Sequence, residues 1–145
     1  MENNKYRARF DKTYIIIYVA TNLFLVAAMI IPALIDPYVG AIIIIAAALV
    51  FVNYFLLSAA VGYVELREES LYIRFGFILS REIPYSKIRG IDRHHKFYAD
   101  SMLSIKNSLD HVNIKYNKFD LVSISVKGED RFLAELCKRS GIQEV

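Results

Sequence analysis

Three histidines and one cysteine are the residues best suited to metal binding or nucleophilic chemistry in this sequence. His94 and His95 are adjacent, and His111 is distant from them in the chain. Neighbouring side chains on a strand point to opposite faces, so His94 and His95 are poorly placed to chelate one metal ion. No carboxylate or cysteine stands at zinc-ligand spacing from them. We interpret both as ordinary loop histidines and predict no metal site.

No arrangement typical of an enzyme is present. The serines lack the G-x-S-x-G elbow of a hydrolase, and the chain has no glycine-rich phosphate loop. Asp110 precedes His111, but it is better explained as a turn residue whose carboxylate accepts backbone N–H bonds. Cys137 falls on the apolar face of a predicted helix, which favours a core position. We predict a protein with no enzyme activity and no cofactor.

One local concentration of basic residues gives a candidate site, although Asp92 within it reduces the positive charge. Its members are Lys87, Arg89, Arg93, His94, His95 and Lys96. Such a cluster is suited to an anionic lipid headgroup or an anionic peptide. The alternative is a solvated edge of a strand and its loop. The net charge of the whole chain is only +3, which gives nucleic-acid binding no support.

The element that must position any site is an apolar stretch over residues 13–61, in which Asp36 is the only charged residue. Residues 13–35 and 38–61 each supply the roughly 20 apolar residues that span a bilayer. Asp36 and Pro37 predict a tight turn between them. Two buried helices of a soluble protein are disfavoured, because so small a domain could not cover them. A cleaved signal peptide is also disfavoured, because the first run is too long and no A-x-A-like site ends it.

Basic residues predict the orientation of this transmembrane hairpin. Residues 1–12 form a basic tail with Lys5, Arg7, Arg9 and Lys12, whereas the turn has no Lys or Arg. Basic residues beside spans remain cytoplasmic. We therefore expect a multi-pass protein of the cell membrane with both termini in the cytoplasm and membrane lipids as partners.

The hairpin also contains two asparagines at similar depth. Asn22 lies near the start of the first span and Asn53 near the end of the second. In an antiparallel pair these side chains can hydrogen-bond, which is worth about 1 kcal/mol in a bilayer. Transport usually needs ionisable groups at depth, and neither span contains one. Helix packing is therefore the preferred role.

Residues 62–145 read as one cytoplasmic domain of six or seven antiparallel strands followed by a helix. Val112, Ile114 and Tyr116 alternate on one strand, and Gly90 suggests a bend or bulge in another. A helical period follows, with acidic residues in the first turn and basic residues in the last. The apolar positions of this period are Phe132, Leu133, Leu136 and Cys137. Gly141 is well placed to end the helix.

Four segments of this domain resemble the bacterial pleckstrin-homology-like (PH-like) domains, especially a short membrane-attached type found in bacteriocin-immunity and uncharacterised proteins. The segments are Leu71–Gly76, Arg81–Ile88, Ser108–Tyr116, and Ile124–Val126 ahead of Phe132–Leu136. His111 stands where the family usually has arginine, and Val126 where it usually has proline. The resemblance covers roughly residues 62–139 and implies an antiparallel β roll or barrel of about seven strands, capped by a C-terminal helix.

The resemblance also implies a non-enzymatic binding module with a membrane anchor. We expect a protein or peptide partner at the inner face of the membrane, and one concrete role is self-immunity against a membrane-active peptide. The alternative is a subunit or assembly factor of a larger membrane complex, with the hairpin packed against other helices.

Overall fold

The computed structural model describes residues 4–35, 39–96, 98–101, 104–106 and 108–143. It contains two long helices, α1 (Lys12–Ile35) and α2 (Val39–Val61), and a shorter C-terminal helix, α3 (Glu129–Ser140). A 3-10 turn, η1 (Tyr85–Lys87), precedes the fifth strand. The strands are β1 (Lys5–Arg7), β2 (Tyr63–Leu66), β3 (Ser70–Phe75), β4 (Leu79–Pro84), β5 (Ile88–His95), β6 (Ser104–Ile105), β7 (Asp110–Tyr116) and β8 (Asp120–Ile124).

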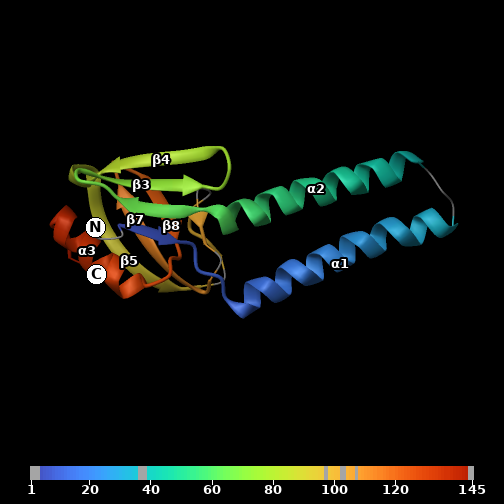
Figure 1. The fold of residues 1–145 in the computed structure, drawn as a ribbon, viewed down its shortest axis with the longest axis horizontal. Helices are drawn as coiled ribbons and strands as arrows, with labels where there is room; N and C mark the ends of the chain where they lie inside the picture. The colour runs from blue at the N-terminus through green and yellow to red at the C-terminus, as the bar shows by residue number, and fades with distance from the viewer. Residues whose placement is uncertain (1–3, 36–38, 97, 102–103, 107, 144–145) are drawn as a thin grey trace.

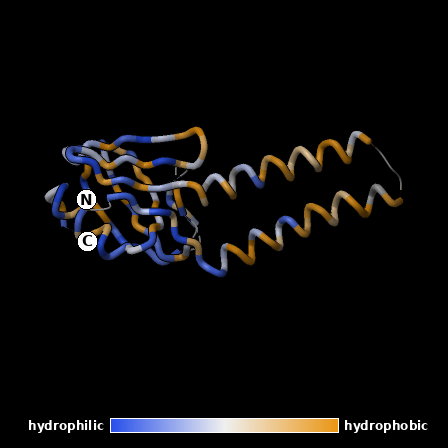
Figure 2. The backbone as a smooth tube through the Cα atoms, in the orientation of Figure 1, coloured by the Kyte–Doolittle hydropathy of each residue, from blue (hydrophilic) through white to orange (hydrophobic). Residues whose placement is uncertain are grey.

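The helices α1 and α2 lie side by side and project from one end of the β domain (Figure 1). Apolar residues run along both of them (Figure 2). Among the described residues, α1 is long and apolar enough over Lys12–Ile31 to cross a membrane, judged by length and composition. The apolar stretch described in α2, Val39–Tyr54, is shorter. The pair suggests membrane association.

The first sheet has the strand order β1-β2-β3-β4, and all its neighbours are antiparallel. Its edge strand β1 comes from the segment that the sequence suggested was only a basic tail. Tyr6 is buried there, with its ring 5.2 Å from that of Phe132 in an edge-to-face contact. Lys5 and Arg7 point to the opposite, exposed face. Burial of Tyr6 in the core explains why so short a segment pairs with β2.

The second sheet has the order β5-β7-β8-β6. The predicted irregularity at Gly90 is confirmed, since the pairing of β5 with β7 shifts register between Ile88 and Gly90. The expectation of a wholly antiparallel domain is wrong at one edge, because β6 runs parallel to β8. Part of the strand predicted over residues 102–105 lies outside the described residues. The described part pairs Ser104 with Ser123 and Ile105 with Ile124.

The apolar core lies between the two sheets and beneath α3. It includes Ile73 and Ile83 of the first sheet, Ile91 and Ile114 of the second, and Phe132 of α3, all at most 2 % exposed. The helix ends as predicted: Gly141 has a φ of 71°, and its N–H donates to the Cys137 carbonyl at 2.9 Å. The PH-like roll with its capping helix, inferred from sequence, is thereby confirmed, with eight strands in two sheets.

Candidate functional sites

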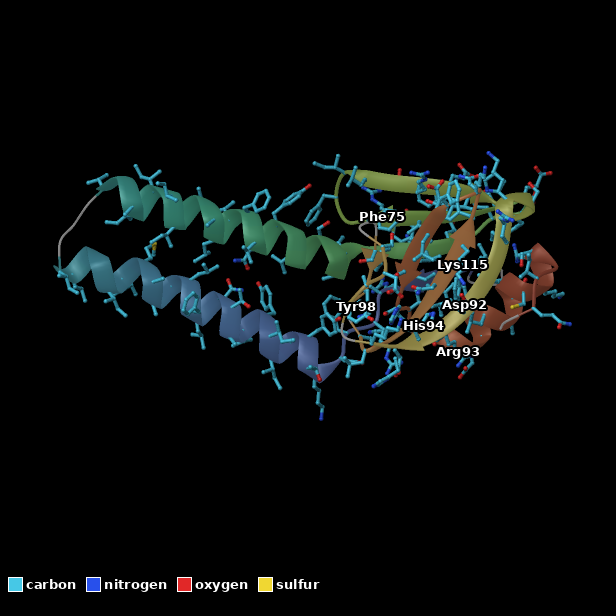
Figure 3. All side chains as sticks on the ribbon, turned by 180° about the vertical axis from the view of Figure 1, so that it is seen from behind. Phe75, Asp92, Arg93, His94, Tyr98 and Lys115 are labelled. Atoms are coloured by element: carbon cyan, nitrogen blue, oxygen red, sulfur yellow. The ribbon has the colours of Figure 1, made fainter. Side chains whose placement is uncertain are left out.

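The strand β5 carries most of the predicted basic cluster but does not gather it. Figure 3 shows Asp92, Arg93 and His94 following one another along β5, with Lys115 on the neighbouring strand. Arg89 lies near the start of the strand and His95 at its end. Six residues of strand separate them by roughly 20 Å. The structure therefore divides the cluster into two groups, one at each end of β5.

The group at the end of β5 forms ion pairs and polar contacts within the domain. Arg93 lies 2.8 Å from Asp130 and 4.0 Å from Glu129, both at the start of α3. His95 Nδ1 lies 2.6 Å from Asp110, and Lys96 lies 3.7 Å from Asp100. A cleft of about 440 Å³ opens beside these residues, lined by Arg9, Arg93, His94, His95, Asp110, Glu129 and Asp130. Its charges are mixed, so it does not select for an anion.

Burial raises the pKa of Glu129 in this cleft, although the charges of Arg93 and Arg9 oppose the effect. Its Oε2 atom is buried and has no hydrogen-bond partner among the described residues. A neutral carboxyl group lowers the cost of such a position. The acidic start of α3, which sequence assigned to the helix dipole, also pairs with Arg93, at the shorter distance through Asp130.

The group at the start of β5 is more accessible. Arg89 Nη1 donates to the Asn117 carbonyl at 3.3 Å, and Lys87 is exposed. A second cleft of about 450 Å³ lies here, at the turn between β7 and β8, and Arg89, Lys115 and Lys118 line it. Phe119 at its rim is 87 % exposed. These neighbours of Arg89 were not predicted from the sequence, although Lys118 and Phe119 in a predicted hairpin turn were a visible signal.

A third cleft, of about 680 Å³, lies where α2 joins the first sheet. We call it the junction groove. Lys5, Arg7 and Arg74 line it together with Tyr63, Phe77 and the end of α2 at Ala60 and Val61. No acidic residue lines this groove among the residues that the structure describes. This groove was not predicted from the sequence, because Arg7 and Arg74 are brought together only by the pairing of β2 with both β1 and β3.

Within the helix pair, the structure brings the two predicted asparagines together. Asn53 Nδ2 donates to Asn22 Oδ1 at 2.6 Å, and Tyr18 adds a hydroxyl bond of 2.7 Å to Asn53 Oδ1. Each amide also donates to the carbonyl one turn earlier in its own helix, those of Tyr18 and Leu49. The pair joins α1 to α2 through side-chain hydrogen bonds.

His111, which the sequence singled out as a departure from the resembled family, is fully buried. Burial lowers its pKa, so the ring is neutral at neutral pH. Nδ1 lies 3.1 Å from the Leu109 carbonyl and must carry the proton, because a carbonyl only accepts. Among the described residues, no group of three or more His, Cys, Asp and Glu side chains is placed to hold a metal ion.

Two four-stranded sheets closed by a C-terminal helix, with clefts at the strand ends, define a PH-like domain of the binding type. The comparison with protein families agrees: a family model described as bacterial PH domain matches residues 62–140. The chain belongs to the bacterial PH domain family. The match begins after the helix pair, so β1 and both long helices lie outside it. A search of curated proteins found no match.

Proposed function

We propose that this protein is a membrane-anchored, non-catalytic binding module of the bacterial cell membrane. In this proposal α1 and α2 cross the membrane as a hairpin, both termini are cytoplasmic, and the PH domain is presented at the inner face. The family supports a binding role for the domain. The apolar helices support the membrane location.

The observation that carries the proposal is the insertion of the helix pair between two adjacent strands of one sheet. The strand β1 enters α1, α2 enters β2, and the two strands pair with Arg7 opposite Tyr63. The Ala8 N–H also donates to the Gly62 carbonyl at 3.3 Å. A domain fastened at both helix ends is held at a fixed orientation to the helix axis, unlike a domain on a flexible linker.

Side chains strengthen this junction at the start of α1. Asp11 accepts hydrogen bonds from the Leu109 N–H, at 3.1 Å, and from the Ser108 hydroxyl. Lys106 Nζ lies 3.1 Å from the Tyr14 hydroxyl. These contacts tie the segment before β7 to the start of α1. In this proposal, the end of the domain from which the helices project therefore always faces the membrane.

Single-cysteine labelling tests the proposed orientation. Cys137 packs against the core and is a poor probe, so it is replaced by alanine, and cysteine is introduced at Asp36 or at exposed Lys127. An impermeant maleimide should label the Asp36→Cys protein on intact cells and the Lys127→Cys protein only after lysis. Labelling of Lys127→Cys on intact cells would refute the cytoplasmic location.

The partner is tested in cells. Self-immunity predicts that loss of the gene sensitises the producer to its membrane-active peptide, and that the wild-type gene restores survival. Phe119→Ser removes the exposed ring beside Arg89 and should weaken this rescue if that cleft receives the peptide. A stoichiometric protein that co-purifies in mild detergent, with unchanged peptide sensitivity, would favour an assembly role instead.

A further inference from the structure

We propose that the junction groove binds the phosphate headgroup of an anionic phospholipid, an inference that rests on the inner-face location proposed above. Three cations line the groove, Lys5, Arg7 and Arg74, and none forms an ion pair with a carboxylate that the structure describes. The adjoining glutamates of the same sheet face, Glu65 and Glu82, are both engaged by Arg67, at 3.6 and 3.1 Å. The groove is therefore electropositive.

The register of the sheet places two arginines on either side of a tyrosine. Arg7 is opposite Tyr63, and Tyr63 is opposite Arg74, so all three side chains share the outer face of the sheet. The arginine backbones are separated by two strand spacings, roughly 10 Å. Two guanidinium groups that converge from this separation can receive one phosphate between them, above the ring of Tyr63.

Arg74 is already held in place for this role. Its Nε donates to the Gly76 carbonyl at 3.1 Å, and Nη2 donates to the Phe77 carbonyl at 3.2 Å. These bonds use two of the five guanidinium N–H groups and leave the others available for an anion. Lys5 is positioned over the Tyr63 ring, 3.7 Å from its centroid, which keeps its charge at the same place.

The position of the β3–β4 turn identifies the ligand as a lipid. The ring of Phe77 lies 5.9 Å from that of Tyr54 in α2. Tyr54 precedes the end of α2 at Val61 by roughly 10 Å along the helix axis, at about 1.5 Å per residue. If α2 spans the membrane, the turn reaches the level of the acyl chains and the junction groove opens at the level of the headgroups.

The composition of the turn agrees with this depth. Phe77, Ile78 and Leu79 are 50, 79 and 58 % exposed, and they form a hydrophobic end of the β3–β4 hairpin (Figure 2). Apolar tips flanked by basic residues are suited to the boundary between headgroups and acyl chains. Ala60 and Val61 line the groove on the other side and can contact an acyl chain.

Native mass spectrometry of the full chain, released from dodecyl maltoside micelles, tests the site. The micelles contain equal amounts of phosphatidylglycerol and phosphatidylcholine. We expect phosphatidylglycerol adducts to predominate and Arg7→Gln to weaken them about tenfold, the effect of losing one charge-assisted contact. Lys5→Gln is a second variant, in case Arg7→Gln alters the melting temperature. The matched control, Lys138→Gln, removes one exposed charge on α3, outside the lining of the groove, and should leave the adducts unchanged.

Three results would overturn the site: adducts that do not depend on Arg7 or Lys5, equal loss in Lys138→Gln, or displacement of the lipid by equimolar glycerol 3-phosphate. The last result would identify a soluble phosphate ligand. The cysteine labelling described above separates the two proposals. If the adducts depend on Arg7 but the labelling places the domain outside the cell, the topology alone would be refuted. Labelling that supports an internal domain, with adducts indifferent to Arg7, would refute the lipid site alone.

Discussion

The outer faces of the two sheets differ in what covers them. On β7 and β8, His111, Asn113 and Ser123 are at most 2 % exposed, because the connection between β5 and β7, which includes Asp100, lies across them. On β1 and β3, Arg7 and Arg74 lie on an open face beside α2. Polar side chains on the covered face complete hydrogen bonds within the fold, whereas Arg7 and Arg74 on the open face are exposed. Burial, rather than residue type, therefore determines which polar side chains are used within the fold.

The largest effect is expected at Asn113, on the covered face. Its side chain accepts a bond from Ser123 Oγ at 2.6 Å and donates to Asp100 at 2.8 Å. Asn113→Ala leaves the buried Ser123 hydroxyl without this partner, and we expect it to lower the free energy of unfolding by about 3 kcal/mol. Urea unfolding in dodecyl maltoside, followed by the near-ultraviolet circular dichroism of tyrosine, measures the change.

The same serine substitution on the two faces provides the control. Ser123→Ala should cost about 1.5 kcal/mol, since the amide oxygen of Asn113 loses its donor. Ser80→Ala, at the exposed position opposite Arg74 on the open face, should stay within about 0.5 kcal/mol of the wild type. Equal losses at Ser80 and Ser123 would mean that the two faces do not differ in this way.

The next effect is expected at Gly76, which brings the open face against α2. Its φ is 81°, and an added Cβ would overlap the Ser58 hydroxyl, whose oxygen also lies 3.3 Å from the Phe75 carbonyl. Gly76→Ala should therefore cost about 2 kcal/mol, partly from backbone strain and partly from the collision. The measurement is again urea unfolding in micelles.

Gly141→Ala separates these two causes. Gly141 has a similar φ of 71°, but a Cβ there would meet nothing within 4 Å among the described residues. Its cost should be only the strain, about 1 kcal/mol. If Gly76→Ala costs no more than Gly141→Ala, the β3–β4 turn is not pressed against the helix.

A smaller, pH-dependent effect is expected from His111. Burial lowers its folded-state pKa below the ordinary value of 6.5, so the unfolded chain binds the proton more readily. Stability is therefore complete above pH 6.5 and falls as the pH drops below it, by at most about 1.4 kcal/mol per pH unit. Unfolding free energies at pH 7.5, 6.5 and 5.5 measure this slope.

His111→Gln should remove that slope, because the substituted residue does not titrate. His95→Gln, on an exposed side chain at the end of β5, should leave the contribution of His111 in place. A slope that survives in His111→Gln would assign the pH dependence to another group.

Sequence predicted the features whose signals are local. The two charge-free apolar runs predicted both long helices, and the similar depth of Asn22 and Asn53 in an antiparallel pair predicted their contact. The change from a strand period to a helical period in the apolar residues, ending at Gly141, predicted α3. The alternation of Val112, Ile114 and Tyr116 placed the strand β7. Each of these patterns extends over enough residues to be read without knowledge of the tertiary fold.

Features that depend on distant partners were not predicted. The strand β1 has three residues and pairs with a strand beyond both long helices, so its alternation is too brief to detect. The strand β6 was predicted, but its parallel pairing with β8 was not, because that pairing joins segments that are distant in the chain. Adjacency in sequence suggested one basic cluster on β5, but Arg93 turns to Asp130 of α3 while Arg89 lies near the β7–β8 turn. Only the register of the strands brings Arg7 and Arg74 together.

The smallest change in stability, less than about 0.5 kcal/mol, is expected from placing a reporter at the tip of the open face. The chain has no tryptophan, so Ile78→Trp and Phe119→Trp each create a single emitter at an exposed position. In proteoliposomes, the emission of the Ile78→Trp protein should shift to the blue and be quenched by brominated phospholipids, because Phe77 beside the new indole contacts Tyr54 within α2. The Phe119→Trp protein should emit like an indole in water and should not be quenched. The side chain at position 119 is 87 % exposed, and the cleft beside it is lined by residues of the β domain. Equal quenching at both positions would mean that the whole domain lies on the bilayer, and no quenching at position 78 would leave the open face in water.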